Sequence, residues 1–238
     1  MTLPKINAPE YSLVVPSTKV EVKYRPFLVK EEKLLLIAQE TGDEKSLYGA
    51  IKNLIHNCCN GQLDVDTMPL FDVEYVFLQL RSKSVGEIAE VLVVCPDDGE
   101  TEVKVKVNLN ELTVELPDKD HNKIKLTDDI GIVMAYPNLA SVLLTAGNTA
   151  EEKKVSDKMF DTILECMFQI WQGEEVFAAT DYSHKEKLDF IDSLSHDQFE
   201  KIQQFFETMP SVKKEVEVTN PKTKIVSKVD IEGMNSFF

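Results

Sequence analysis

The chain has 238 residues, of which 43% are hydrophobic, and a formal net charge of −15 at pH 7. This length suits one large domain or two small ones, and the hydrophobic content is that of a folded protein. The negative charge argues against nucleic-acid binding, which needs clustered Lys and Arg, and the absence of any run of eighteen apolar residues argues against a transmembrane helix.

Residues 1–88 are predicted to form an N-terminal unit, a β-hairpin followed by three helices. Apolar residues alternate over 11–24, which predicts two strands and a turn. Helical spacing then predicts helices over 29–40, 47–58 and 68–86. The third helix is apolar around most of its circumference, which is typical of a helix buried between two layers.

Residues 89–135 are predicted to form a small antiparallel β unit. Four successive segments have the composition or alternation of strands, namely 88–94, 103–107, 112–116 and 124–126. The sequence Pro-Asp-Asp-Gly between the first two is typical of a turn.

Residues 136–238 are predicted to form a C-terminal helical unit that ends in a β-hairpin. Helical spacing of apolar residues predicts one helix over 156–172. Capping-box patterns at Ser183–Glu186 and Ser195–Gln198 predict the starts of two short helices. Alternation predicts the hairpin over 212–231, so the expected fold class is α+β.

No pattern of residues points to catalysis or to a bound cofactor. The chain lacks a phosphate-binding Gly loop, an HExxH motif and a CxxC motif. His56, Cys58 and Cys59 are a poor start for a metal site, because neighbouring cysteines point apart on a helix and zinc needs about four ligands. Asp192 and His196 have the spacing of a surface ion pair. We therefore expect no enzyme and no catalytic, cofactor or metal residues, with a metal-assisted hydrolase as the less favoured alternative.

The four cysteines have no disulfide spacing and are typical of free thiols in a reducing compartment. The first ten residues lack the hydrophobic core of a signal peptide, so none is expected. The Met and aromatic residues of 159–171 allow a binding groove, but core packing is the favoured interpretation.

Candidate partner-binding residues lie on the third helix and at the C-terminus. Three residues of that helix are expected to pack internally: Leu70, Val73 and Phe77. Tyr75, Leu78 and Arg81 are expected to face a partner. Phe237 and Phe238 would be costly to expose to water, so they are expected to dock on a protein surface. The edges of the two predicted hairpins are further candidates, because an edge strand can add to the sheet of a partner.

Three segments, spread in order over most of the chain, carry a resemblance to a known family. They are 22–33, which reads Val-Lys-Tyr-Arg-Pro-Phe-Leu-Val-Lys-Glu-Glu-Lys, then 70–87, and 194–210 together with the terminal Gly-Met-Asn-Ser-Phe-Phe. In these segments the chain resembles the T4-like bacteriophage baseplate hub subunit and hub assembly protein family. The resemblance implies a phage tail protein whose partners are other baseplate hub and tail proteins, and it implies no active-site residues.

The resemblance leaves two roles open. A structural component would be retained in the baseplate of the virion tail, whereas a transient assembly chaperone would act in the host cytoplasm and be absent from the finished particle. Mass spectrometry of purified virions separates the two roles, and the oligomeric state stays open.

Overall fold

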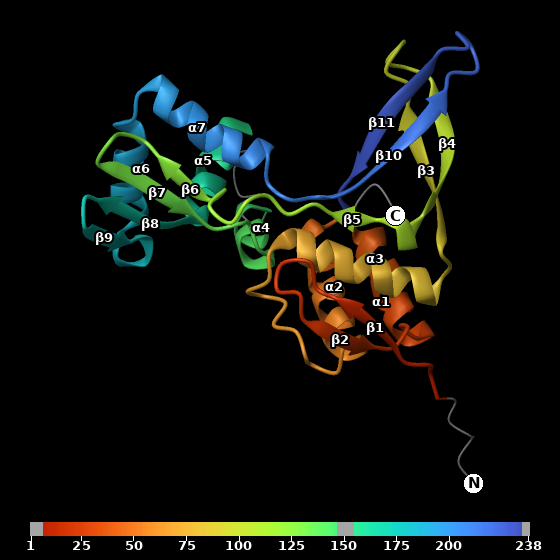
Figure 1. Ribbon diagram of the computed structural model, residues 1–238. Coiled ribbons are helices and arrows are strands. Elements are labelled where there is room, and N and C mark those ends of the chain that lie inside the picture. Colours follow the sequence, from red (N-terminus) through yellow and green to blue (C-terminus); the bar gives the residue numbers. More distant parts are fainter. Residues whose placement is uncertain (1–6, 147–154, 235–238) are drawn as a thin grey trace. The chain divides into compact units, whose positions relative to one another are not determined.

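The computed structural model describes residues 7–146 and 155–234, which form two compact units (Figure 1). The discontinuous unit comprises the described residues up to Glu115 and those from Ser211 onward, and the inserted unit comprises Leu116–Pro210. The described residues contain seven α-helices and several small antiparallel sheets, so the predicted α+β class is confirmed. The sequence suggested three consecutive units; in the structure the tail hairpin belongs with the N-terminal part, because β10 pairs with β5.

The discontinuous unit is built around one central helix. Its N-terminal elements are β1 (Tyr11–Val14), β2 (Glu21–Tyr24), α1 (Val29–Thr41), α2 (Glu44–Cys58) and α3 (Leu70–Ser84). The hairpin and all three helices match the predicted segments closely. Eight of the fifteen residues of α3 are buried, as its apolar circumference predicts. Asp72 on α3 is also buried and accepts hydrogen bonds from the backbone N–H and the hydroxyl of Ser17, which tie the turn of the first hairpin to this helix.

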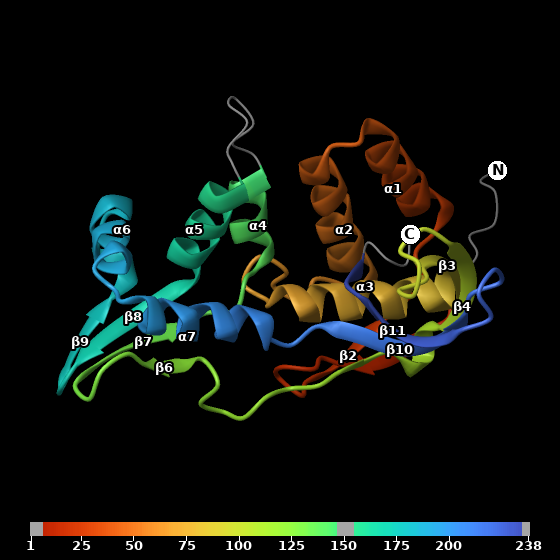
Figure 2. The same cartoon turned by 90° about the horizontal axis from the view of Figure 1, so that it is seen from above.

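Two further hairpins pack against each other in this unit (Figures 1 and 2). Their elements are β3 (Ile88–Val94), β4 (Glu102–Asn108), β10 (Val212–Thr219) and β11 (Val226–Glu232), with the 3-10 helix η1 (Leu109–Glu111) and the short strand β5 (Thr113–Val114) after β4. Alternate residues of β3 are buried, among them Val91 and Val93, and Val218 of β10 is buried as well. The predicted C-terminal hairpin is confirmed.

Hydrogen bonds join the turns of these two hairpins in a tip cluster, which consists of Asp97, Asp98, Asn220 and Thr223. Asn220 is fully buried, and its Nδ2 donates to both carboxylate oxygens of Asp97 at 3.0 Å and to Oδ2 of Asp98 at 2.9 Å. Its Oδ1 accepts from the backbone N–H of Lys222 at 2.8 Å. Hydrogen bonds from Thr223 and Asn220 hold the pKa of Asp97 below its usual value.

The change Asn220→Ala is expected to lower the free energy of unfolding by about 2 kcal/mol, because it removes every side-chain bond between Asn220 and the first turn. Urea unfolding at pH 7 measures this change. Asn53→Ala, at an exposed position of α2, is the control and is expected to alter stability by less than about 0.5 kcal/mol. Equal effects of the two changes would contradict the role given to the tip cluster.

The inserted unit is a four-stranded antiparallel sheet with helices on one face. The strands occur in the order β6 (Lys123–Lys125), β7 (Ile130–Met134), β8 (Met167–Gln172) and β9 (Glu175–Ala178). The helices are α4 (Leu139–Ala146), α5 (Val155–Cys166), the 3-10 helix η2 (Ala179–Asp181), α6 (His184–Asp192) and α7 (His196–Glu207). Ile124 and Ile132 of the sheet share one core with Ile163, Ile191 and Ile202 of α5, α6 and α7. Both predicted capping boxes are present at the starts of α6 and α7.

Two sequence-based expectations are corrected by the structure. The helix predicted over 156–172 ends at Cys166, and Met167–Gln172 is strand β8, paired on one side with β7 and on the other with β9. The predicted β unit over 89–135 does not exist as one sheet: β3 pairs with β4, β5 pairs with β10, and β6 pairs with β7. Alternation of residues predicts that a segment is a strand, but the partner of each strand is set by distant parts of the chain.

Candidate protein-binding surfaces

The three predicted partner-binding residues on α3 differ in their burial. Leu78 is fully buried, so the expectation that it faces a partner is corrected: it is a core residue of the discontinuous unit. Tyr75 and Arg81 are half-buried, and burial raises the pKa of Tyr75 and lowers that of Arg81. Within the described part of the chain, Nη1 of Arg81 is buried without a hydrogen-bond partner. Partner binding by Tyr75 and Arg81 stays a prediction.

The sequence also predicted which residues of α3 pack internally and that the two terminal Phe residues dock on a protein surface. Val73 and Phe77 are buried, as predicted for internal packing, and Leu70 is partly buried. Phe237 and Phe238 lie outside the described residues, so their docking stays a prediction.

Exposed apolar side chains also gather on α1, which is not among the partner-binding surfaces predicted from the sequence. Only one side of α1 is buried, through Leu35, Ala38 and the carboxylate-bearing Glu31. We call the exposed part of α1, together with Leu28 just before it, the α1 outer surface; its large apolar residues are between 43% and 79% exposed, and they are Leu28, Val29, Leu34, Leu36 and Ile37. Figure 2 shows α1 at the periphery of the discontinuous unit, with α2 along one side. The signal in the sequence is Leu34–Ile37: four successive apolar residues point around a helix and cannot all face one core.

Buried polar contacts hold α1 in place at its first turn. Glu31 is 3% exposed, and its carboxylate accepts from the backbone N–H of Leu28 at 2.8 Å and from Nη2 of Arg25 at 3.0 Å. The backbone N–H of Arg25 donates to the carbonyl of Cys58 at the end of α2. Burial by itself raises the pKa of Glu31, but the hydrogen bonds from Arg25 and Leu28 outweigh it and hold the pKa below its ordinary value. The α1 outer surface is therefore carried by a firmly anchored helix.

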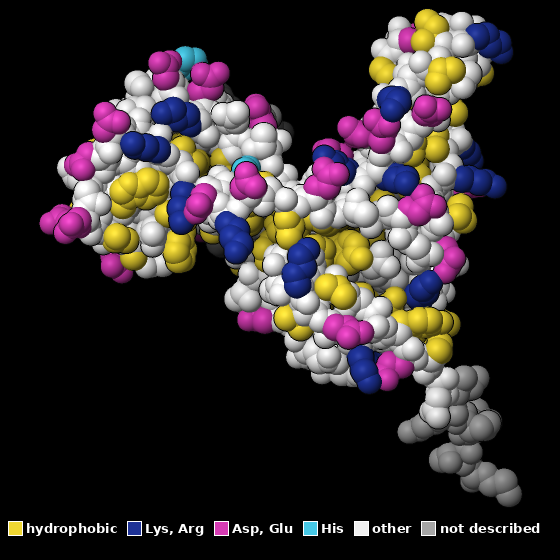
Figure 3. Space-filling view, viewed as in Figure 1, with side chains coloured by type: hydrophobic (Ala, Val, Ile, Leu, Met, Phe, Trp, Pro, Cys, Tyr) yellow, Lys and Arg dark blue, Asp and Glu magenta, His cyan; other side chains and the backbone are white. Residues whose placement is uncertain are grey.

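A second apolar area lies on the sheet of the inserted unit, on the face away from α5, α6 and α7. Val176 is 60% exposed there beside its strand partner Trp171, which is partly exposed. Phe168, at the irregular start of β8, is 59% exposed. Figure 3 shows hydrophobic side chains gathered over β7, β8 and β9. Because large exposed apolar patches are uncommon on proteins that act alone, both areas are candidate contact surfaces.

The described residues offer little that resembles catalytic chemistry. In the ranges 7–146 and 155–234, no three His, Cys, Asp or Glu side chains gather as metal ligands would. Burial raises the pKa of Cys58 to about 11 and those of Cys59 and Cys166 to about 12, which keeps these thiols protonated at neutral pH. Ser183 and Ser195 are occupied in capping α6 and α7. Among the helices of residues 7–146 and 155–234 we find no candidate for a membrane span.

Comparison with known proteins gives one clear result. Residues 8–238 match a protein family described as T4 bacteriophage base plate protein. Comparisons with curated proteins and with solved structures found no match. Because the family match spans nearly the whole chain, this protein belongs to the T4 bacteriophage base plate protein family.

Proposed function

We propose that the protein acts without catalysis, as a structural component of the baseplate hub of a contractile phage tail or as a factor in its assembly. It does so by binding other hub and tail proteins. The family supports a role in the baseplate. The narrower assignment to the hub rests on the resemblance carried by residues 22–33, 70–87 and 194–210.

The observation that carries this proposal is the α1 outer surface. Burying a large apolar side chain is worth on the order of 1–2 kcal/mol, so a partner that covers several of these residues gains substantial affinity. Segment 22–33, part of the resemblance, contains Arg25 and Glu31, which anchor α1, together with Leu28 and Val29 of the surface itself. The same short segment thus both positions the surface and contributes to it.

The double change Val29→Glu and Leu36→Glu is expected to weaken binding to co-expressed hub proteins at least about tenfold, because it places two charges where apolar contact is needed. These residues are seven positions apart on α1, hence on one side of the helix. They are 79% and 53% exposed, so the folded chain accommodates the charges and its thermal unfolding midpoint stays unchanged. Quantitative pulldown with purified hub proteins measures the effect.

The matched control is Leu92→Glu, which places a charge on β3 at a residue that is 62% exposed. Hub binding that is unchanged in the α1 double variant, or reduced equally in the control, would contradict the proposal. Mass spectrometry of purified virions then assigns the role: a fixed copy number supports a structural component, and absence supports a transient chaperone.

A further inference from the structure

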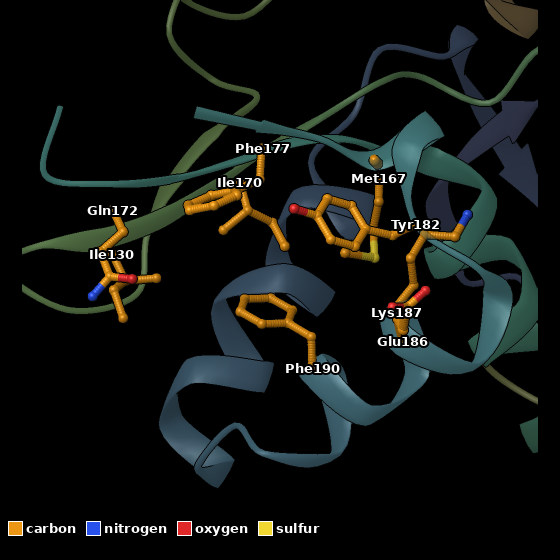
Figure 4. Close-up of a pocket in the computed structure, with 10 residues that line it drawn as sticks. Ile130, Met167, Ile170, Gln172, Phe177, Tyr182, Glu186, Lys187 and Phe190 are labelled. Carbon is orange, nitrogen blue, oxygen red and sulfur yellow. The ribbon is translucent and has the colours of Figure 1, made fainter. Parts of the chain in front are cut away.

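A cavity of about 330 Å³ lies in the inserted unit between the sheet and α6 (Figure 4). Most of its lining is apolar and includes Met167, Ile170, Phe177 and Phe190. Figure 4 shows Phe190 pointing from α6 toward Ile170 and Phe177 on the strands. The ring of Tyr182 meets that of Phe177 edge to face, with centroids 6.5 Å apart. This volume is at the small end for ligand pockets and suits one or two large side chains.

The cavity adjoins a strand edge that lacks a partner. β9 is the last strand of the four-stranded sheet, and no described strand pairs with its outer side. Gly173 has a positive φ of 59° in the two-residue turn between β8 and β9, and Gln172 faces Glu175 across that turn. In such a hairpin the residues flanking the turn exchange backbone hydrogen bonds, so the amide of Val176 points away from β8. The backbone at Val176 can therefore bond to an added strand.

Side chains of an added strand would reach the cavity by the same alternation that governs β9. Phe177 of β9 lines the cavity, whereas Val176 is 60% exposed. Side chains of neighbouring strands at the same level point to the same face of a sheet. A strand paired with β9 would thus direct the side chain beside Phe177 toward the cavity mouth.

The segment that carries β9 and α6 is acidic, and Glu186 and Lys187 of this segment line the cavity. Between Gln172 and Asp192 the chain carries two lysines and six acidic residues, the latter being Glu174, Glu175, Asp181, Glu186, Asp189 and Asp192. One of the lysines, Lys187, donates its Nζ to the carbonyl of Leu164 at 2.9 Å. A ligand with basic groups on either side of an apolar group therefore complements the surroundings of the cavity.

We infer that β9 and the cavity bind an extended segment of a partner protein, in which Lys or Arg residues stand two positions before and two positions after a large apolar side chain, on the same face of the strand. The segment pairs with β9 through backbone hydrogen bonds, its apolar side chain enters the cavity, and its basic side chains meet the carboxylates around it. This inference rests on the proposed function, in which the protein acts by binding other proteins, and it gives the chemistry of the partner at a second surface.

The test is an NMR titration of the full-length ¹⁵N-labelled protein with the peptide Thr-Lys-Thr-Phe-Thr-Lys-Thr, whose Phe and Lys side chains lie on one face of an extended strand. Saturable shifts are expected for the backbone amides of β9 and of α6. A peptide with Glu in place of every Lys, or with Ser in place of Phe, is expected to bind at least about tenfold more weakly. Equal binding of the acidic peptide, or shifts confined to residues outside β9 and α6, would overturn the inference, as would an absence of binding.

The variant Val176→Pro removes the outward amide and is expected to weaken peptide binding about tenfold, whereas Val176→Thr retains the amide and is expected to bind normally. Equal affinity of the two variants would count against strand addition. A titration with octanoate tests for an acyl-chain ligand. If octanoate shifts the amide resonances of the cavity residues and the peptide does not, the cavity binds an acyl chain and the inference is overturned. Hub binding through the α1 outer surface is scored separately by pulldown, so this inference can fail while the proposed function stands.

Discussion

Replacing Gly131 with alanine is expected to destabilise the inserted unit by about 2 kcal/mol and to displace the ring of Trp171. A Cβ atom at Gly131 would lie 2.0 Å from Cζ2 and 2.3 Å from Cη2 of this ring, far inside van der Waals contact. Gly131 and Trp171 are direct partners in the pairing of β7 with β8. The ring must therefore swing away, which exposes apolar surface and removes its packing against β7.

Fluorescence gives a direct measurement, because Trp171 is the only tryptophan in the chain. Its emission is expected to shift to longer wavelength and become more readily quenched by iodide, and the urea midpoint of the inserted unit is expected to fall. Gly49→Ala is the matched control: nothing lies within 4 Å of an added Cβ on this helical glycine, so stability should rise by about 0.5–1 kcal/mol with unchanged emission. Wild-type emission and stability in Gly131→Ala would refute this packing.

Replacing Arg25 with methionine is expected to lower the free energy of unfolding of the discontinuous unit by about 3 kcal/mol. The change keeps the length and apolar stem of the side chain but removes the guanidinium bound to the carboxylate of Glu31. Since Glu31 is only 3% exposed, its charge is then left with the N–H of Leu28 and with Lys30, whose Nζ lies 3.3 Å away and which is itself 70% exposed. Urea unfolding at pH 7 measures the loss.

The pH dependence of this effect follows from the pKa of Glu31. In the wild type that pKa lies below its ordinary value of 4.5, so the stabilisation from Glu31 is present above pH 4.5 and is lost as the pH falls through the folded-state pKa. In Arg25→Met the effect of burial, which raises the pKa of Glu31, is no longer opposed by the guanidinium. Acidification therefore lowers the free energy of unfolding of this variant less than that of the wild type. The difference in free energy of unfolding between the wild type and Arg25→Met should therefore become smaller from pH 7 to pH 4.

Two further variants complete the experiment on Arg25. Lys30→Met removes an exposed charge near the same carboxylate and is expected to cost less than about 0.5 kcal/mol. Glu31→Gln removes the buried charge while retaining an acceptor for Leu28, and it should be milder than Arg25→Met. A loss in Arg25→Met no larger than that in Lys30→Met would show that the guanidinium does not anchor α1.

The candidate surfaces were harder to find from the sequence than the elements that carry them. Leu78 lies on a second apolar stripe of its helix, which suggested a partner, yet the same helix is buried on both sides. The four apolar residues Leu34–Ile37 predict an apolar helix. Only the fold shows that α2 packs against one side of α1 while other apolar residues of α1 stay exposed. Met167 and Ile170 belong to a stretch considered as a groove; they line the cavity beside α6, while Ile163 and Cys166 are core.

The sequence by itself determined the features that depend on neighbouring residues. Hydrogen bonds within a capping box span three residues, so Ser183 and Ser195 specify the starts of α6 and α7 wherever these helices lie. Alternation over a few residues likewise specified the hairpins of β1 with β2, β3 with β4, and β10 with β11. The apolar circumference of α3 specified that this helix is central.

Tertiary structure alone decided which of these elements meet. The segment 167–172 has helical spacing of apolar residues, yet it is a strand, because pairing with β7 and β9 satisfies its backbone and places Trp171 over Gly131. Strand β10 pairs with β5 although the whole inserted unit lies between them in the sequence, and no local pattern predicts this pairing. The pattern of apolar residues shows only which side chains favour burial. Contacts between distant segments determine whether those side chains are buried within this chain or remain exposed to another protein.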